Sequence, residues 1–119
     1  MKIFSILVLY KQPNEGSKAR ILKSSSDLSN FGYFQRGSVE EFLKFTSKIL
    51  VERSTVGARS SVKEQDYIAH VYVKPDQLSC VIYTDQEYPK RVAHTLINKI
   101  LEDFSKTVPI NSWPTLIEE

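Results

Sequence analysis

The 119-residue chain has little cysteine and little excess charge. Its single cysteine, Cys80, has no partner for an internal disulfide and fits a reducing compartment. Sixteen Lys and Arg against fourteen Asp and Glu leave a net charge of +2, which is too small to predict a nucleic-acid partner. Four glycines, five prolines and 41% hydrophobic residues exclude a collagen and a disordered tail. The length predicts one compact domain.

The chain also lacks a long apolar run. The longest, residues 6–10, has five residues, whereas a membrane-spanning helix needs about 20. Lys2 followed by apolar residues is similar to the start of a short signal peptide, but no small-x-small cleavage site follows. The sequence therefore favours a buried N-terminal strand over a signal peptide.

Hydrophobic periodicity predicts five strands and two helices. Strands are expected at residues 3–10, 19–24, 59–63, 67–73 and 78–84. Helices are expected at residues 39–53 and from Pro89, as a first helical residue, until Pro109 ends the helix. The order ββαβββα predicts an α+β fold, in which one mostly antiparallel five-stranded sheet carries two helices. The polar strand at 59–63 suits a sheet edge.

The first helix has an apolar stripe. Ser38 and Glu41 form a capping box that is expected to start it. At 100° per residue, the stripe is expected to contain Phe42, Leu43, Thr46, Ile49 and Leu50. Phe45 lies on its shoulder, and two interpretations are open: the ring completes the core, or it lies exposed beside a groove. With the edge strand at 59–63, such a groove would dock a peptide.

Three aromatic residues precede this helix in a segment without periodicity. They are Phe31, Tyr33 and Phe34, around a glycine. Because a loop cannot leave so much aromatic surface in water cheaply, we expect these rings to plug the loop onto the core.

The sequence contains no pattern typical of catalysis, metal binding or a cofactor. The four glycines are scattered, and none opens a phosphate-binding loop. His70 and His94 lack the spacing of metal ligands. A nucleophile pair of Cys80 with a histidine is the remaining enzymatic interpretation. Cys80 lies mid-strand, where a small buried filler is expected. We therefore predict no catalytic residue, no metal site, no cofactor and no enzyme.

Three blocks of the sequence resemble longin domains. The first block comprises residues 27–36, 38–39, 41–42 and 45; the second comprises 51–54, 61–67 and 70–73; the third comprises 87–89, 91–93, 95–96 and 99–101. Over nearly the whole chain they are similar to the longin domains of lipid-anchored R-SNAREs, which are prenylated and palmitoylated. The resemblance implies that residues 1–119 form one longin domain with a profilin-like fold. A third helix, usual in this family, is expected to be missing or truncated.

The resemblance implies a regulatory function in vesicle-mediated transport and membrane fusion. In these R-SNAREs the longin domain folds back on the SNARE motif and the prenyl and palmitoyl groups, and this closed state is cytosolic. Opening frees the motif to join cognate SNAREs at Golgi, endosomal, vacuolar and autophagosomal membranes, including ER–Golgi transport. Contact with a membrane is then indirect, through the lipidated tail, and the isolated domain is expected to be monomeric.

The resemblance also favours the groove interpretation of Phe45, because the aligned Phe lies in a groove between the first helix and the third strand. The expected lining residues are Phe45, Phe42, Ile49, Val62 and Tyr67. The 119 residues hold no SNARE heptads and no C-terminal Cys-a-a-X box. We therefore expect either an excised regulatory domain or a natural short form whose activity is binding. The alternative function is a stand-alone longin-like scaffold subunit of a vesicle tethering or adaptor complex.

Overall fold

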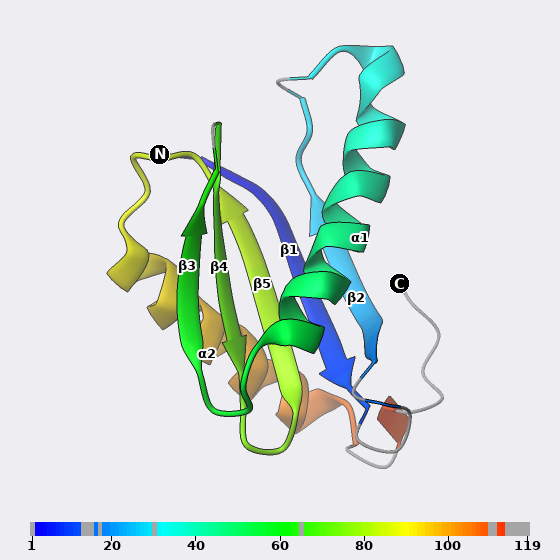
Figure 1. The fold of residues 1–119 in the computed structure, drawn as a ribbon, viewed down its shortest axis with the longest axis vertical. Helices are drawn as coiled ribbons and strands as arrows, with labels where there is room; N and C mark the ends of the chain where they lie inside the picture. Colours follow the sequence, from blue (N-terminus) through cyan, green and yellow to red (C-terminus); the bar gives the residue numbers. More distant parts are fainter. Residues whose placement is uncertain are drawn as a thin grey trace.

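The computed structural model describes residues 2–12, 16, 18–29, 31–64, 66–109 and 112–113. In chain order the elements are β1 (Ile3–Lys11), β2 (Ala19–Ser26), the 3-10 helix η2 (Tyr33–Gln35), α1 (Arg36–Arg53), β3 (Arg59–Lys63), β4 (Ile68–Val73), β5 (Leu78–Thr84) and α2 (Lys90–Thr107). This order confirms the predicted α+β class (Figure 1). The expectation of a missing or truncated third helix falls on residues 114–119, which lie outside the described residues.

The five strands form one sheet in the order β2-β1-β5-β4-β3. Each neighbouring pair is antiparallel. All seven residues of β5 are buried, because this central strand is covered on both faces. The polar strand β3 pairs only with β4 and forms an edge, as predicted.

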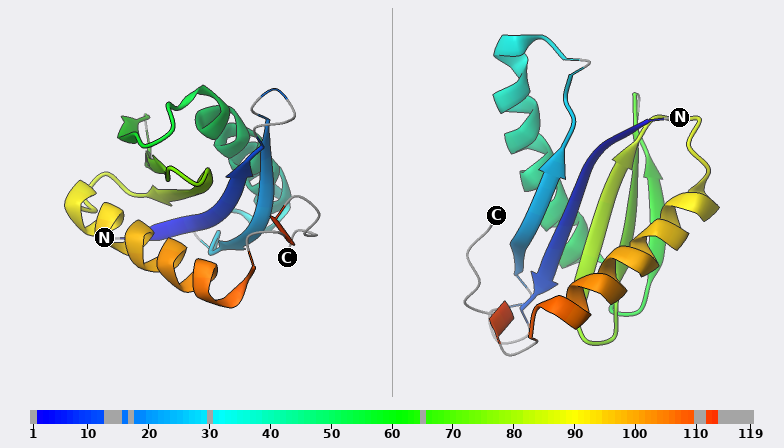
Figure 2. Two further views of the ribbon diagram at one scale, coloured as in Figure 1. Left: turned by 90° about the horizontal axis from the view of Figure 1, so that it is seen from below. Right: turned by 180° about the vertical axis from the view of Figure 1, so that it is seen from behind.

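The two helices cover opposite faces of the sheet (Figure 2). Alternate side chains of each inner strand therefore enter two different cores. In β4, Ala69 and Val71 face α1, whereas His70 and Tyr72 face α2. In β5, Tyr83 lies under α1 and Cys80 lies under α2.

Helix α1 begins earlier than predicted and turns a different face to the sheet. Its N-cap is Gln35, so Ser38 lies inside the first turn and the capping-box prediction is wrong. The buried residues are Leu43, Ser47 and Val51. At about 100° per residue, the centre of this buried face is rotated roughly 100° from the predicted stripe, whose phase was wrong. The small Ser47 can lie close to the sheet, where its Oγ is 2.9 Å from the Tyr83 hydroxyl.

Helix α2 matches its predicted extent almost completely. Pro89 is the N-cap and not the first helical residue, and the last helical residue, Thr107, precedes Pro109. The carbonyl of Pro89 accepts the first helical hydrogen bond, from the Ala93 N–H at 3.0 Å. The buried residues Ala93, Ile97, Leu101 and Phe104 follow the spacing of one helical face.

The loop aromatics divide into one half-buried ring and two exposed rings. Phe31 is half-buried and packs edge-on against Phe4, with ring centroids 6.2 Å apart. Tyr33 and Phe34 are 77% and 94% exposed, so the prediction that they plug the loop onto the core is wrong. They lie on η2, which turns them away from the sheet and against each other, with centroids 5.4 Å apart.

Gln77 occupies a left-handed position in the turn between β4 and β5, with φ of 74°. Its buried Oε1 has no hydrogen-bond partner among the described residues. Glycine adopts this conformation without a Cβ clash, so we expect Gln77→Gly to raise the free energy of unfolding by about 1 kcal/mol. The backbone bond from Lys11 N–H to the Gln77 carbonyl is retained. Urea unfolding measures the change. Gln77→Ala keeps the strain and should show no such gain, and a loss in Gln77→Gly would contradict the argument.

Candidate functional site

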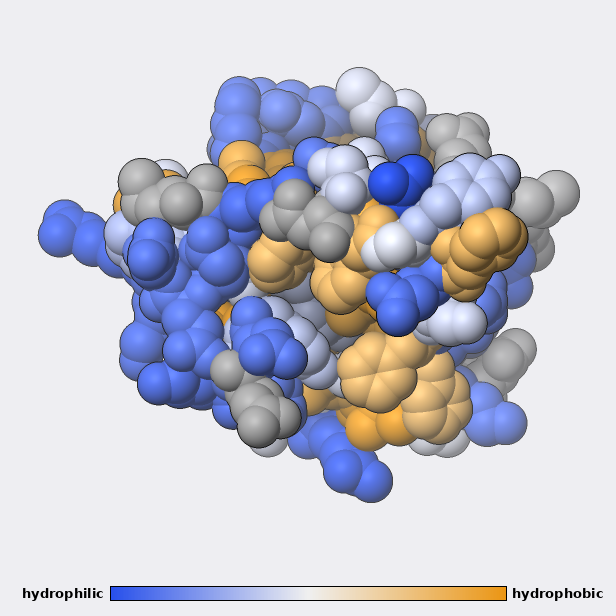
Figure 3. Space-filling view, turned by 90° about the horizontal axis from the view of Figure 1, so that it is seen from above, coloured by the Kyte–Doolittle hydropathy of each residue, from blue (hydrophilic) through white to orange (hydrophobic). Residues whose placement is uncertain are grey.

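An apolar cavity of about 300 Å³ opens beside the N-terminal half of α1. Residues from β1, the β2–α1 connection, α1, the β3–β4 turn and β5 line it: Phe4, Phe31, Val39, Phe42, Leu43, Asp66, Tyr67 and Tyr83. We call this cavity the α1 groove. Apolar side chains gather on this end of the molecule (Figure 3).

The floor of the α1 groove is held by a small hydrogen-bonded cluster. The Tyr83 hydroxyl lies 2.9 Å from Ser47 Oγ and donates to the Leu43 carbonyl at 3.1 Å. Tyr67 packs edge-on against Tyr83, with centroids 5.6 Å apart. This arrangement satisfies the buried Tyr83 hydroxyl within the protein.

The tyrosines of the floor stay neutral. Burial raises the pKa of Tyr67, and the negative charge of Glu64 adds to the effect. Burial also raises the pKa of Tyr83 above its ordinary range. Asp66 is the single acidic residue of the lining. A neutral, aromatic cavity with a small polar rim accommodates aliphatic or aromatic groups.

The structure places the five predicted groove residues in two groups. Phe42 and Tyr67 line the α1 groove. Phe45, Ile49 and Val62 are not among its lining residues. Phe45 is 64% exposed, so its ring does not complete the core. Ile49 is half-buried, and Val62 packs against the core under α1.

An apolar ridge continues from the groove along α1. Phe42, Phe45 and Ile49 are three and four residues apart, and this spacing places them on one side of the helix. Phe42 is 53% exposed. The groove and the ridge together form a larger apolar surface than either does alone.

The remaining lining residues were missed as site residues by the sequence. Phe4 and Tyr83 come from strands far apart in the chain, and they meet because β1 pairs with β5. Leu43 belongs to the apolar stripe that was predicted for this helix, but neither Val39 nor Leu43 was assigned to the groove. Phe31 was not assigned to the groove either, but its contact with the core was predicted from the sequence, and this contact is confirmed.

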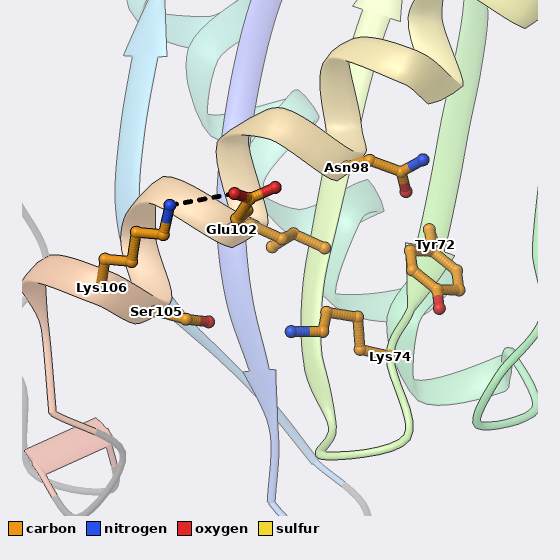
Figure 4. A pocket seen from close by; sticks show the side chains of 7 residues that line it. Tyr72, Lys74, Asn98, Glu102, Ser105 and Lys106 are labelled. Atoms are coloured by element: carbon orange, nitrogen blue, oxygen red, sulfur yellow. Dashed lines mark hydrogen bonds and ion pairs between the residues drawn. The ribbon is translucent and has the colours of Figure 1, made fainter.

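A second cleft, of about 370 Å³, lies between α2 and β4 (Figure 4). Its polar lining contains Lys106, which is paired with Glu102 at 3.0 Å, and Lys74, whose Nζ is 3.4 Å from Asp76. These pairs neutralise the charges at the rim of the cleft. Neither large exposed aromatic surface nor unpaired acid–base groups converge there, so we take the α1 groove as the candidate site.

The candidate enzymatic residues lie away from the α1 groove. Cys80 is fully buried in β5, and burial raises the pKa of its thiol, which opposes formation of a thiolate. Among the described residues, no three His, Cys, Asp or Glu side chains gather closely enough to hold a metal ion. Neither described helix combines the length and the apolar character needed to cross a bilayer.

Comparison with known families identifies the fold. Residues 28–119 match the family model Longin, described as a Regulated-SNARE-like domain. The chain belongs to the longin family.

Three similar curated proteins carry the same name. The chain is 42% identical over 113 residues to "Synaptobrevin homolog ykt6" of Schizosaccharomyces pombe, an alignment that covers 95% of this chain and 56% of that protein. It is 43% identical over 116 residues to the protein of the same name from Debaryomyces hansenii, with 98% and 56% covered. With the Yarrowia lipolytica protein the identity is 42% over 113 residues, with 95% and 55% covered. The chain thus spans little more than half the length of these relatives.

Proposed function

We propose that this chain is the regulatory longin domain of an R-SNARE that acts in vesicle-mediated transport and membrane fusion. In this proposal the α1 groove and its ridge bind the SNARE motif and the prenyl and palmitoyl groups of the full-length protein, and no enzymatic step is involved. Membership of the longin family and the similarity to proteins named synaptobrevin homologs support it. The observation that carries it is the open apolar groove flanked by two exposed phenylalanine rings.

The exposed rings are costly in water unless something covers them. Apolar surface in water costs roughly 25 cal/mol per Å², and contiguous exposed patches mark interaction sites. Phe42 and Phe45, at 53% and 64% exposure, share one side of α1. An amphipathic segment presents apolar anchors at the same helical spacing, and an acyl or prenyl chain is apolar throughout. Both occupants match a neutral aromatic cavity.

The contact need not be tight. A SNARE motif on the same chain meets the groove at an effective concentration in the millimolar range for a short linker. A weak contact then suffices for a closed cytosolic state. Opening would release the motif to cognate SNAREs at Golgi, endosomal, vacuolar and autophagosomal membranes.

The test is Phe45→Glu, with a SNARE-motif peptide and a fluorescent fatty acid as separate probes. We expect at least a tenfold loss of affinity, because burying a Phe is worth about 1.5–3 kcal/mol and a buried carboxylate adds a desolvation cost. Thermal melting should be nearly unchanged, because the Phe45 ring is largely exposed. Titration by fluorescence anisotropy measures the affinity.

A matched control is Val92→Glu, which places the same charge at a half-exposed apolar residue on the opposite face of the sheet. It should bind both probes like the unchanged domain. Unfolding of Phe45→Glu would show that Phe45 is a core residue. If Phe45→Glu bound both probes as tightly as the unchanged domain, the proposed binding at the α1 groove and its ridge would be contradicted.

A further inference from the structure

Four polar side chains form a hydrogen-bonded chain on the α2 side of the sheet. His70 Nε2 lies 2.9 Å from Thr84 Oγ1, and His70 Nδ1 lies 2.8 Å from Ser61 Oγ. Ser61 Oγ is in turn 3.1 Å from His94 Nε2. The chain therefore joins β5, β4, β3 and α2 in one line, which we call the histidine latch.

The proton positions follow from one end of the latch. The Thr84 hydroxyl donates to the Asp85 carbonyl at 2.9 Å, so Thr84 Oγ1 must accept from His70 Nε2–H. His70 Nδ1 then has no proton and accepts from the Ser61 hydroxyl. Ser61 Oγ accepts from His94 Nε2–H. For neutral imidazoles, these bonds place the proton of both rings on Nε2.

A further proton on either ring disturbs the hydrogen bonds of the latch. His94 Nδ1 is buried and has no hydrogen-bond partner among the described residues. Protonation of His70 Nδ1 would turn this nitrogen into a donor toward Ser61 Oγ, and the Ser61 hydroxyl, which also accepts from His94, would then lose the acceptor of its own proton. An added proton therefore breaks a bond of the latch or leaves a buried donor unpaired, and both outcomes are costly.

The charges around the two rings are positive. Burial lowers the pKa of His70 to about 4, and the neighbouring His94 and Lys90 act in the same direction. Burial lowers the pKa of His94, and Arg59 on β3 lowers it further. Hydrogen bonding to the Ser60 backbone raises this pKa in part, and Lys90 on α2 adds a smaller lowering. No carboxylate is among the groups that shift either ring.

The latch lies at the β3 edge of the sheet. Edge strand β3 has a sheet partner only in β4. On the α2 side it is held by Ser61 and by Arg59, whose guanidinium carbon lies 3.7 Å from the Tyr72 ring centroid and whose Nη2 donates to Asn98 at 2.6 Å. Figure 1 shows β3 at the edge of the sheet with α2 behind it. If the Ser61 bonds are lost, the contacts of Arg59 with Tyr72 and Asn98 still connect β3 to the α2 side of the sheet.

We propose that the histidine latch is an acid-sensitive device that holds β3 and the N-terminal half of α2 on the sheet and releases them before the rest of the domain opens. The proposal is independent of the proposed function, because the latch lies on the sheet face opposite the α1 groove. Both rings stay neutral in the fold but take up a proton below about pH 6.5 when released. The contribution of the latch to the stability of this region is therefore fully present above pH 6.5, and it is lost as the pH falls toward 4.

The test is amide hydrogen exchange on the 119-residue chain, measured by NMR from pH 7.5 to 4.5 and corrected for the intrinsic rate. Below pH 6.5 we expect the opening constants of β3 and the first half of α2 to rise up to tenfold per pH unit for each titrating histidine. Amides of β1 and β5 should keep their protection. His94→Gln retains an amide donor near the position of Nε2 but takes up no proton, so its rise should be shallower by up to tenfold per pH unit.

Thr95→Ala is the matched control on the same helix. The Thr95 hydroxyl is exposed and donates to the Arg91 carbonyl at 2.9 Å, outside the latch. This variant should keep the unchanged pH profile. A His94→Gln profile as steep as that of the unchanged domain, or a uniform loss of protection in all strands, would overturn the proposal.

A second measurement does not depend on a variant. The ¹⁵N shifts of the two imidazoles in the unchanged domain should show the Nε2–H form for both rings at pH 7. Either ring in the Nδ1–H form, or both rings titrating near pH 6.5 in the folded domain, would contradict the latch.

Discussion

Replacement of Trp113 by alanine is expected to lower the free energy of unfolding by about 3–5 kcal/mol, the usual cost of removing a buried aromatic ring. Trp113 is 1% exposed although it lies beyond the end of α2. Its ring packs edge-on against Tyr10, with centroids 5.7 Å apart, and lies 6.3 Å from Phe104. Its Nε1–H donates to the Val108 carbonyl at 3.3 Å. The ring thus closes one end of the core beneath α2.

Guanidinium unfolding followed by far-UV circular dichroism measures this loss, because the variant has no tryptophan left for fluorescence. Trp113→Phe keeps an aromatic ring in the cavity and should lose clearly less than Trp113→Ala. Since domains are stable by about 5–15 kcal/mol in total, the alanine variant should melt far below the unchanged domain. A loss under about 1 kcal/mol would mean that Trp113 does not belong to the core.

Alanine at Ile97 is expected to cost about 2–5 kcal/mol, whereas alanine at Val92 should change stability by less than about 0.5 kcal/mol. Both residues belong to the apolar pattern of α2. Ile97 is fully buried against the sheet, but Val92 is 48% exposed. Five residues separate them, which turns Val92 about 140° away from Ile97. The pair therefore tests which part of a broad apolar stripe faces the core.

The same unfolding measurement serves both variants. Equal losses at Ile97 and Val92 would show that α2 is rotated about its axis relative to the position described here. A small loss at Ile97 would show that the sheet and α2 are loosely packed.

The order of elements could be predicted from the sequence because each strand and helix carries its own period. The alternation of β4 and the β-rich composition of β5 are local patterns that indicated strands, and the polar character of β3 indicated its place at the edge of the sheet. The regular spacing of apolar residues on one helical face indicated helix α2. Three blocks of residues also sufficed to identify the longin resemblance, which the family match confirms.

The face that α1 presents to the sheet was decided by the tertiary structure. Its sequence holds more apolar residues than one face accommodates, so the period alone admits several phases. The small Ser47, placed over Tyr83 of β5, selects the phase that brings the helix close to the sheet. Phe42 and Phe45 are left on the outside as a consequence. The exposed rings beside the α1 groove are thus the part of the apolar pattern of α1 that the core does not bury.

Contacts between segments that are far apart in the chain could likewise not be predicted from the sequence. Phe4 and Tyr83 meet in the α1 groove, and His70, Ser61 and His94 meet in the histidine latch, because the strand order brings their elements together. Periodicity determined which residues of this protein form strands and helices, since it depends on neighbours in the chain. The groove, the latch and the burial of Trp113 depend on which elements pack together, and that was decided when the two helices closed over the sheet.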